Sequence, residues 1–339
     1  MKKKAIFLAT LLGVAALEAQ YEDCENCSCC YNWNLSVSPL LWQAHEDGLD
    51  YMIKNQSGLA FINNKGRVKR VDFDWDWGVR VGLGYQTNCI GDLEAEWTYY
   101  STSAKDSTSA VFPAGLFTAW TIPGSSITTS TKAKARWKLD LNRLDVKLGA
   151  ALFPTCFLSI KPYIALSTAW IDQKFNINSS GGVMQGPAAF LVLDDDINLK
   201  NDFWGIGPKV GLDTTWCLGC GFSLVGNFDF SILYGCFDLR QTESILFQDV
   251  TPAIVYLDLK KDTFWTSRVN LDFLLGVKWE YTFCDCCYSL SVEAGWENLF
   301  FFEQNQLKRF FDDDNPGIHL STNGDLSFQG LTLKVNFGF

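Results

Sequence analysis

The chain has 339 residues with a formal net charge of −10, and 47 % of its residues are apolar, 15 % aromatic and 19 % charged. Such an acidic chain has no electrostatic reason to bind nucleic acid. No stretch reaches the roughly 18 consecutive apolar residues of a transmembrane helix, so apolar and charged residues must be interleaved along the chain.

The N-terminus has the pattern of a secretory signal peptide. Three lysines at positions 2–4 precede an apolar run at 5–17, and a plausible cleavage site lies before Gln20. A buried N-terminal helix is the alternative. Removing residues 1–19 takes away three lysines and one glutamate, which leaves a formal charge of −12. We therefore expect a cleaved peptide over 1–19, a cysteine-rich periplasmic segment over 20–31 and the folded domain over 32–339.

Alternation with period 2 is clearest between Val71 and Tyr85. Val, Phe, Trp, Trp, Val, Val, Leu and Tyr occupy the odd positions, and Asp, Asp, Asp, Gly, Arg, Gly and Gly the even ones. Period 2 predicts a strand, because successive side chains point to opposite faces. The run is far longer than the strand of about five or six residues that is typical of soluble sheets, and it suits a tilted strand that crosses a membrane.

Similar alternation recurs along the whole chain. The predicted strands cover 32–43, 68–87, 92–103, 131–152, 157–175, 200–216, 221–237, 263–283, 288–303 and 327–339. Their apolar faces must contact lipid and their polar faces a lumen, because a soluble protein could not expose so many aromatic side chains. We therefore expect an all-β fold, a single antiparallel transmembrane β-barrel of about ten strands, although strands hidden in the connections could raise the number to twelve or more. The fourth strand changes phase near Asn142, which predicts a β-bulge.

The connections alternate between short and long. Tight turns are predicted near 87–91, 153–156, 217–220 and 284–287, and long connections near 44–67, 104–130, 176–199, 238–262 and 304–326. Outer-membrane barrels place their short turns in the periplasm and their long loops outside the cell. An even strand number also places both termini in the periplasm.

Charged side chains on the polar faces are candidates for lining a pore. They are Asp72, Asp74, Asp76, Arg80, Glu94, Glu96, Lys132, Lys134, Arg136, Lys138, Arg268, Asp272, Lys278 and Glu280. Neighbouring strands of opposite charge suggest either a transverse field in a water-filled pore or a network of ion pairs that fills a narrow barrel. Ten strands leave little free bore, since wide channels belong to barrels of about 16 to 18 strands.

The last strand ends the chain on an aromatic residue. Its apolar face carries Leu331, Leu333, Val335, Phe337 and Phe339. A terminal aromatic after an alternating strand resembles the sorting signal that the outer-membrane barrel insertion machinery reads. An ordinary edge strand is the alternative.

Twelve cysteines in an exported chain predict disulfides. Eleven of them fall in the N-terminal segment or beside predicted periplasmic turns: Cys24, Cys27, Cys29, Cys30, Cys89, Cys156, Cys217, Cys220, Cys284, Cys286 and Cys287. Only Cys236 lies elsewhere. Internal disulfides, intermolecular disulfides to other envelope proteins and a zinc site built from two C-x₂-C elements all remain open.

Nothing in the sequence predicts catalysis. The chain has two histidines, His45 and His319, and although acidic residues follow His45, no nucleophile motif accompanies it. The acidic runs at 194–196 and 312–314 could hold divalent cations shared with lipid A phosphates, but such runs are more often simply solvated acidic loops. We expect no enzyme, no resident metal and no cofactor, and a hydrolase that uses His45 is the weakest alternative.

Two motifs carry a family resemblance. The run from Asp72 to Tyr85, and the run Asp202-Phe-Trp-Gly-Ile-Gly-Pro-Lys-Val-Gly-Leu-Asp213 followed by Leu233-Tyr-Gly235, resemble the major-outer-membrane-protein-like family of Legionella and chlamydia-related bacteria. The resemblance covers about 33–339 and transfers no catalytic or ligand residue. It implies a porin-like, cysteine-rich envelope protein that is abundant and often disulfide cross-linked.

These observations together predict an integral protein of the bacterial outer membrane. Its expected function is porin-like diffusion of small polar solutes or ions, together with envelope rigidity from disulfides. The alternative is a structural or adhesive barrel with a blocked lumen whose loops bind other surfaces. The expected partners are outer-membrane lipid and lipopolysaccharide, the barrel-insertion machinery, and either disulfide-linked envelope proteins or further copies of the chain in a homo-oligomer.

Overall fold

A computed structural model describes residues 33–56, 65–87, 91–120, 127–184, 190–248, 250–283, 288–310 and 317–339. Within this part of the chain, no helical segment has the length and apolar character needed to cross a membrane. The predicted signal peptide and the cysteine-rich segment at 20–31 lie outside the described residues and stay predictions.

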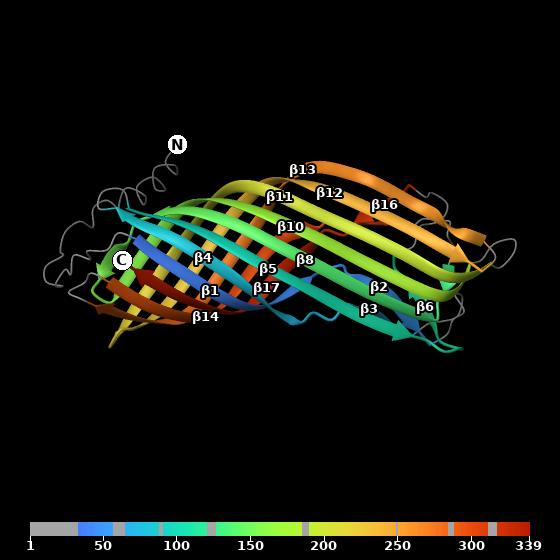
Figure 1. Cartoon of the computed structure of the whole chain (residues 1–339), viewed down its shortest axis with the longest axis horizontal. Helices are drawn as coiled ribbons and strands as arrows, with labels where there is room; N and C mark the ends of the chain where they lie inside the picture. The colour runs from blue at the N-terminus through green and yellow to red at the C-terminus, as the bar shows by residue number, and fades with distance from the viewer. Residues whose placement is uncertain are drawn as a thin grey trace, which may run out of the picture.

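Ten long antiparallel strands close into one barrel (Figure 1), so the predicted fold class is confirmed. They are hydrogen-bonded in the order β11-β12-β13-β14-β17-β1-β4-β5-β8-β10, and β10 pairs back to β11. In chain order these strands are β1 (Trp33–Glu46), β4 (Trp75–Thr87), β5 (Gly91–Ser109), β8 (Lys132–Gly149), β10 (Leu158–Met184), β11 (Phe190–Gly219), β12 (Phe222–Phe247), β13 (Val250–Phe283), β14 (Tyr288–Asn305) and β17 (Gly324–Gly338).

Seven short strands lie outside the ten barrel strands in the described part of the chain. Strands β7 (Ile127–Thr129) and β9 (Leu152–Thr155) pair with β10. A separate three-stranded sheet contains β2 (Asp50–Asn55), β3 (Gly66–Arg70) and β6 (Gly115–Thr118), and β15 (Lys308–Phe310) pairs with β16 (His319–Ser321). The β2-β3-β6 sheet lies toward the end of the barrel away from the C-terminus (Figure 1).

The first and last strands close the wall. The backbone amide of Trp33 donates to the carbonyl oxygen of Phe339 at 3.0 Å, and the amide of Phe339 donates to the carbonyl oxygen of Trp33 at 2.8 Å. The start of the first barrel strand and the end of the last therefore meet at one rim, where the C-terminus is drawn in Figure 1. Because outer-membrane barrels keep their termini in the periplasm, we assign this rim to the periplasmic side.

A tight turn joins β11 to β12 at the periplasmic rim. Gly219, Cys220 and Gly221 have φ values of 108°, 54° and 82°. Three successive residues with positive φ make a turn that two glycines can adopt without strain. The prediction of a short turn near 217–220 is therefore confirmed.

The outer wall carries an apolar band with aromatic side chains at both edges. At the periplasmic edge, Trp216 is 55 % exposed, and Trp33 packs against Tyr85 with ring centroids 4.8 Å apart. At the opposite edge, Trp204 is 42 % exposed and packs against Trp265 with centroids 5.9 Å apart. Exposed aliphatic side chains fill the space between, as expected for a surface in contact with lipid.

Above the outer aromatic edge, the apolar side chains change from the outer to the inner face. On β8, Leu144 and Val146 are exposed below this edge, whereas Trp137 and Leu139 are buried inside the barrel above it. The β8 register with β5 and β10 runs through Asn142 without a break, so the predicted bulge is wrong. The strand is straight, and its outer surroundings change from lipid to water.

The barrel extends farther from the membrane than the sequence predicted. The connections expected at 176–199 and 238–262 consist mostly of strand, since β10 extends to Met184, β11 begins at Phe190, β12 reaches Phe247 and β13 begins at Val250. Buried Phe175, Ile177, Ile197 and Leu199 alternate with polar residues there and extend the wall into water. Long loops at those two positions were therefore wrongly predicted.

The predicted strand at 68–87 is interrupted. Residues 68–70 belong to β3, and the barrel strand β4 begins only at Trp75. Val71 and Phe73 pack against the core, while Trp75 and Trp77 are 45 % and 69 % exposed. The odd-numbered side chains therefore point inward up to Phe73 and outward from Trp75. A regularly paired strand cannot contain such a change of face, so the strand is interrupted there.

Candidate functional site

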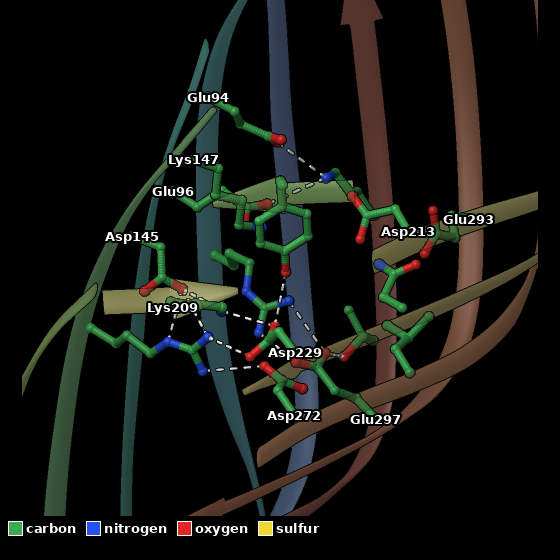
Figure 2. A pocket seen from close by; sticks show the side chains of 17 residues that line it. Glu94, Glu96, Asp145, Lys147, Lys209, Asp213, Asp229, Asp272, Glu293 and Glu297 are labelled. Atoms are coloured by element: carbon green, nitrogen blue, oxygen red, sulfur yellow. Dashed lines mark hydrogen bonds and ion pairs between the residues drawn. The ribbon is translucent and has the colours of Figure 1, made fainter. Parts of the chain in front are cut away.

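The inward-facing side chains at membrane height are mostly charged. The charged ones around the central cavity come from eight different strands of the wall, because every second residue of each strand points into the barrel. Figure 2 shows these side chains converging on one central cavity. Its charged lining residues are Arg80, Glu94, Glu96, Arg143, Asp145, Lys147, Lys209, Asp213, Asp229, Asp272, Glu293, Glu297 and Lys334.

Arg143 is the centre of the largest ion network. Its guanidinium lies 2.8 Å from the Asp145 carboxylate, 3.1 Å from Asp272 and 3.8 Å from Asp229. The ammonium of Lys209, which is 2 % exposed, lies 2.8 Å from Asp229 and 3.1 Å from Asp145. Two cations therefore hold three buried carboxylates, and each of these charges has at least one opposite partner.

A second network joins β4 to β14 and β17. The Arg80 guanidinium donates to both carboxylate oxygens of Glu297, at 2.6 Å and 3.3 Å, and to the Thr98 hydroxyl at 3.0 Å. The Thr332 hydroxyl donates to Glu297 at 2.6 Å. Arg80 also lies 5.6 Å from the ring centroid of Trp42, which connects the charged region to the apolar residues above it.

A third network lies closer to the periplasm. Glu96 accepts from the ammonium groups of Lys147 and Lys334, and Lys334 also lies 3.5 Å from Glu94. Lys147 lies 5.4 Å from the ring centroid of Tyr163. The three networks leave about 60 Å³ of free space in the central cavity. A water needs about 10–15 Å³ by the same measure, so the cavity holds only a few water molecules.

A layer of apolar side chains closes the lumen above the charged region. Tyr100, Phe301 and Phe237 are 0 % exposed, and Trp42 and Phe328 are each 1 % exposed. The ring centroids of Tyr100 and Phe328 lie 5.5 Å apart, and those of Phe301 and Phe328 lie 6.2 Å apart. These residues belong to one continuous core with Leu139, Leu141, Ile171 and Phe203 of the facing strands. The apolar layer therefore spans the barrel from wall to wall.

Four of the fourteen predicted pore-lining residues lie in the central cavity. They are Arg80, Glu94, Glu96 and Asp272. Lys278 lines a second cavity of about 230 Å³, which also includes Asn34 and Asn336 near the periplasmic rim. Glu280 pairs with Lys278 at 2.5 Å.

Two further predicted residues lie at the height of the apolar layer. Asp76 accepts a hydrogen bond of 2.5 Å from the Thr102 hydroxyl. Arg268 lies 5.2 Å from the ring centroid of Phe237 and pairs with Glu303 at 3.0 Å. Neither lines the central cavity.

Six predictions of pore-lining residues need correction. The structure places Asp72 and Asp74 at exposed positions before β4 begins, and it places four basic residues of β8 on the outer wall. These four are Lys132, Lys134, Arg136 and Lys138. The reason is the exchange of faces above the outer aromatic edge, where polar side chains point outward into water and apolar side chains point inward.

Several central residues were missed by the prediction. Arg143, Asp145 and Lys147 alternate with Leu144, Val146 and Leu148, so the phase after Asn142 already identified them as inward-facing. Lys209 and Asp213 lie on the polar face of a predicted strand but were not selected. The remaining missed charges were Asp229, Glu293, Glu297 and Lys334.

Three of the rim cysteines are described. Cys156, Cys217 and Cys220 are exposed at the periplasmic end, and neither Cys217 nor Cys220 is bonded to another described cysteine. The other predicted disulfide cysteines lie outside the described residues: Cys24, Cys27, Cys29, Cys30, Cys89, Cys284, Cys286 and Cys287. Cys236 lies on the outer wall opposite Trp204 and Trp265.

The C-terminal residues face outward as an apolar row. Leu331, Leu333, Val335, Phe337 and Phe339 are 37–47 % exposed and belong to the band in contact with lipid. Their role as an insertion signal stays a prediction.

The side chain of His45 lies 3.3 Å from the Asp47 carboxylate, and both side chains are more than half exposed.

Comparison with known proteins gave one family match. A family model described as the Legionella pneumophila major outer membrane protein precursor matches residues 27–339. No curated protein matches the chain.

Solved structures with similar folds are bacterial outer-membrane barrels. The crystal structure of the outer membrane protease OmpT from Escherichia coli is 12 % identical over 91 % of this chain and 96 % of that chain, with a TM-score of 0.41. The toluene transporter TodX of Pseudomonas putida is 9 % identical over 91 % of this chain and 89 % of that chain, with a TM-score of 0.31.

Proposed function

Since the chain belongs to the family of the Legionella pneumophila major outer membrane protein, we propose that it is a structural outer-membrane barrel that is closed at rest. Its extracellular wall and loops would contact other surfaces, while its lumen would pass no solute. The apolar layer carries this proposal. Trp42 and Tyr100 lie on β1 and β5, and Phe237 lies on β12 across the barrel, yet each is at most 1 % exposed.

Two features of the lumen support closure. A hydrated ion cannot cross a packed apolar layer without losing its water, because the layer offers no replacement ligands. Below that layer, the ion networks of Arg143 and Arg80 occupy most of the central cavity. Moving Arg143 would leave Asp272, and moving Arg80 would leave Glu297, buried without its cationic partner, which costs several kcal/mol.

Single-channel conductance of the refolded mature chain in a planar bilayer tests the proposal. We expect a silent bilayer, with insertion verified by heat-modifiable migration in gels. The double variant Phe301→Ala/Phe328→Ala removes two rings from the layer and should produce discrete current steps. The matched control Phe228→Ala/Phe273→Ala removes two rings that are 51 % and 41 % exposed on the lipid-facing wall and should stay silent. Current steps from the unmodified barrel would overturn the proposal.

Passage of ions or small polar solutes is the second candidate function. Side chains of both signs line the central cavity, and a second polar cavity continues from it toward the periplasmic rim through Lys161, Asp213 and Lys278. Such a path suits ions once the apolar layer has rearranged. Discrete steps that appear in the unmodified protein under an applied voltage would favour this function over closure.

Envelope rigidity through disulfides is part of the proposed function. Cys217 and Cys220 are exposed at the periplasmic rim, where a thiol on a neighbouring envelope protein could reach them. We expect cross-linked species on gels of cell envelopes without reductant, and their loss on reduction. If a Cys217→Ser/Cys220→Ser variant gives the same cross-linked bands on these gels, other cysteines form the cross-links.

We also propose that the chain has no catalytic function. His45 and Asp47 form an exposed pair, and the imidazole packs edge-on against Phe73 with ring centroids 4.8 Å apart. A peptidase or lipase activity of the purified barrel that disappears in His45→Ala would refute this.

A further inference from the structure

Like charges form rows across the outer wall above the membrane. The register places the basic side chains of β8, β10, β11 and β12 directly opposite one another: Lys138, Lys174, Lys200 and Arg240. Two residues closer to the membrane, the same four strands place a row of acidic side chains: Asp140, Asp172, Asp202 and Asp238. We call these the basic row and the acidic row.

The basic row lies at the height of lipid headgroups. The register places Trp170 opposite Trp204, two residues below the acidic row, and these side chains mark the outer edge of the hydrocarbon. Lys174 is four residues above Trp170. This spacing corresponds to about 13 Å along the strand and about 10 Å in height for a strand tilted by about 40°.

Two of the four side chains of the basic row form no ion pair with a residue that the structure describes. Lys200 pairs with Asp202, and Arg240 pairs with Asp238 at 3.2 Å. Lys138 and Lys174 form no ion pair with any described residue, and neither does Arg136, the next outward-facing residue of β8 above Lys138. Like charges directly opposite one another destabilise a sheet. The acidic row offsets part of this repulsion, since Lys174 and Lys200 both interact electrostatically with Asp172, and an external anion would reduce what remains.

A groove lies directly above the basic row. It has a volume of about 700 Å³ on the outer wall of β5, β8, β10 and β11. Its charged lining residues are three cations, Lys105, Lys134 and Arg136, and two carboxylates, Asp106 and Asp196. Asn176 and Asn198, which face each other in the register, line it together with Asn178. Amide side chains both donate and accept hydrogen bonds, which suits the hydroxyls of a sugar.

We propose that this wall binds the phosphorylated saccharide headgroup of the glycolipid in the outer leaflet, which is lipopolysaccharide. Its phosphates bind Lys138, Lys174 and Arg136, its sugar hydroxyls bind the asparagines of the groove, and its acyl chains lie against the lipid-facing wall below Trp170. Phosphate groups form strong, charge-assisted hydrogen bonds with lysine and arginine. Charge and height together favour this ligand over a plain phospholipid, whose small headgroup would leave the groove empty.

Binding of lipopolysaccharide to the refolded barrel in micelles tests the proposal. The probes are intact lipopolysaccharide, the same glycolipid after removal of its phosphates, and phosphatidylglycerol at equal phosphate concentration. We expect saturable binding of the intact glycolipid, and clearly weaker binding of the other two. Equal binding of phosphatidylglycerol, or no binding of intact lipopolysaccharide, would overturn the proposal.

Variants locate the site. Loss of two charge-assisted contacts in Lys138→Gln/Lys174→Gln should weaken lipopolysaccharide binding by about tenfold or more. The matched control Lys65→Gln/Lys69→Gln removes the same charge from the region of β3, outside the groove, and should bind like the unmodified protein. Heat-modifiable migration shows whether each variant folds. Equal affinity of the folded Lys138→Gln/Lys174→Gln variant and the control would refute this location.

The groove is tested separately from the basic row. Asn176→Leu/Asn198→Leu keeps every charge but removes two amide groups from the groove. We expect weaker binding of the phosphorylated glycolipid with no change in the weak binding of phosphatidylglycerol. If both affinities stay the same as in the unmodified protein, the sugar does not occupy the groove.

Discussion

Replacing Glu46 by glutamine should change how the stability of the barrel depends on pH. Glu46 lies above the outer aromatic edge and is 2 % exposed, and the side chains of Gln173 and Trp137 are its nearby polar partners. Burial raises the pKa of this carboxyl from its ordinary value of 4.5 to about 8. The folded state therefore holds a proton that the unfolded state releases, and the free energy of unfolding must fall as the pH rises between these two values.

The size of the effect follows from that difference in pKa. Each unit corresponds to about 1.4 kcal/mol, so the buried carboxyl costs about 3 kcal/mol of stability at pH 7 and on the order of 5 kcal/mol at pH 9. Glu46→Gln should match the unmodified protein at pH 4 and exceed it by these amounts at pH 7 and pH 9. The variant keeps the volume of the side chain but cannot ionise.

Reversible urea unfolding in micelles, followed by tryptophan fluorescence from pH 4 to pH 9, measures the difference. Asp74→Asn is the control, because it removes an exposed carboxylate near the same end of the barrel. It should leave the pH dependence unchanged. If the unmodified protein and Glu46→Gln have parallel stability curves over the whole range, Glu46 is not the group that titrates, and the reasoning from burial is wrong.

Three further predictions concern the wall and its interior. Arg143→Met leaves three buried aspartates with Lys209 alone and should lower the free energy of unfolding by about 3–5 kcal/mol in urea titrations. Gly207→Val places a Cβ 1.9 Å from a carbonyl oxygen of β12 and should abolish heat-modifiable folding, whereas Gly317→Ala, with nothing within 4 Å, should fold normally. Deleting Phe339 removes both terminal hydrogen bonds to β1 and should slow barrel closure in refolding kinetics.

The membrane-embedded half of the fold could be predicted from the sequence. Below the outer aromatic edge, lipid makes every outward residue apolar, and alternation therefore reports directly which face a residue occupies. Residues from Trp75 to Tyr85, and the runs ending in Trp216 and Phe339, were assigned to the correct face for this reason. Closure and strand number followed from the count of such runs.

The half outside the membrane could not be predicted by the same rule. Alternation states that Lys134 and Ala135 face opposite ways, but not which of them is inside. Above the membrane the outside is water and the inside is an apolar core, so the assignment is reversed. The phase change near Asn142 was the visible signal of this reversal, and it was interpreted as a bulge because a bulge produces the same pattern in a sequence.

The central ion networks were partly predictable. Arg143 and Asp145 follow the phase change, and they were not selected as pore-lining residues because that change was interpreted as a bulge. Lys209 is a single cation in a strand rich in glycine, and its significance depends on Asp145 and Asp229, which lie far away in the sequence. Only the closed barrel brings these strands to opposite sides of one cavity.

The stacking of a tryptophan row, an acidic row and a basic row has a consequence for the bilayer itself. Sliding the barrel inward by one pleat would bring Asp172 and Asp202 to the height of Trp170 and Trp204, at the edge of the hydrocarbon, where a charge is costly. Sliding it outward would expose the apolar band to water. The protein therefore cannot adjust its depth to membranes of different thickness. Where the two do not match, the lipids around it must stretch or compress, so each copy imposes its own local thickness on the membrane.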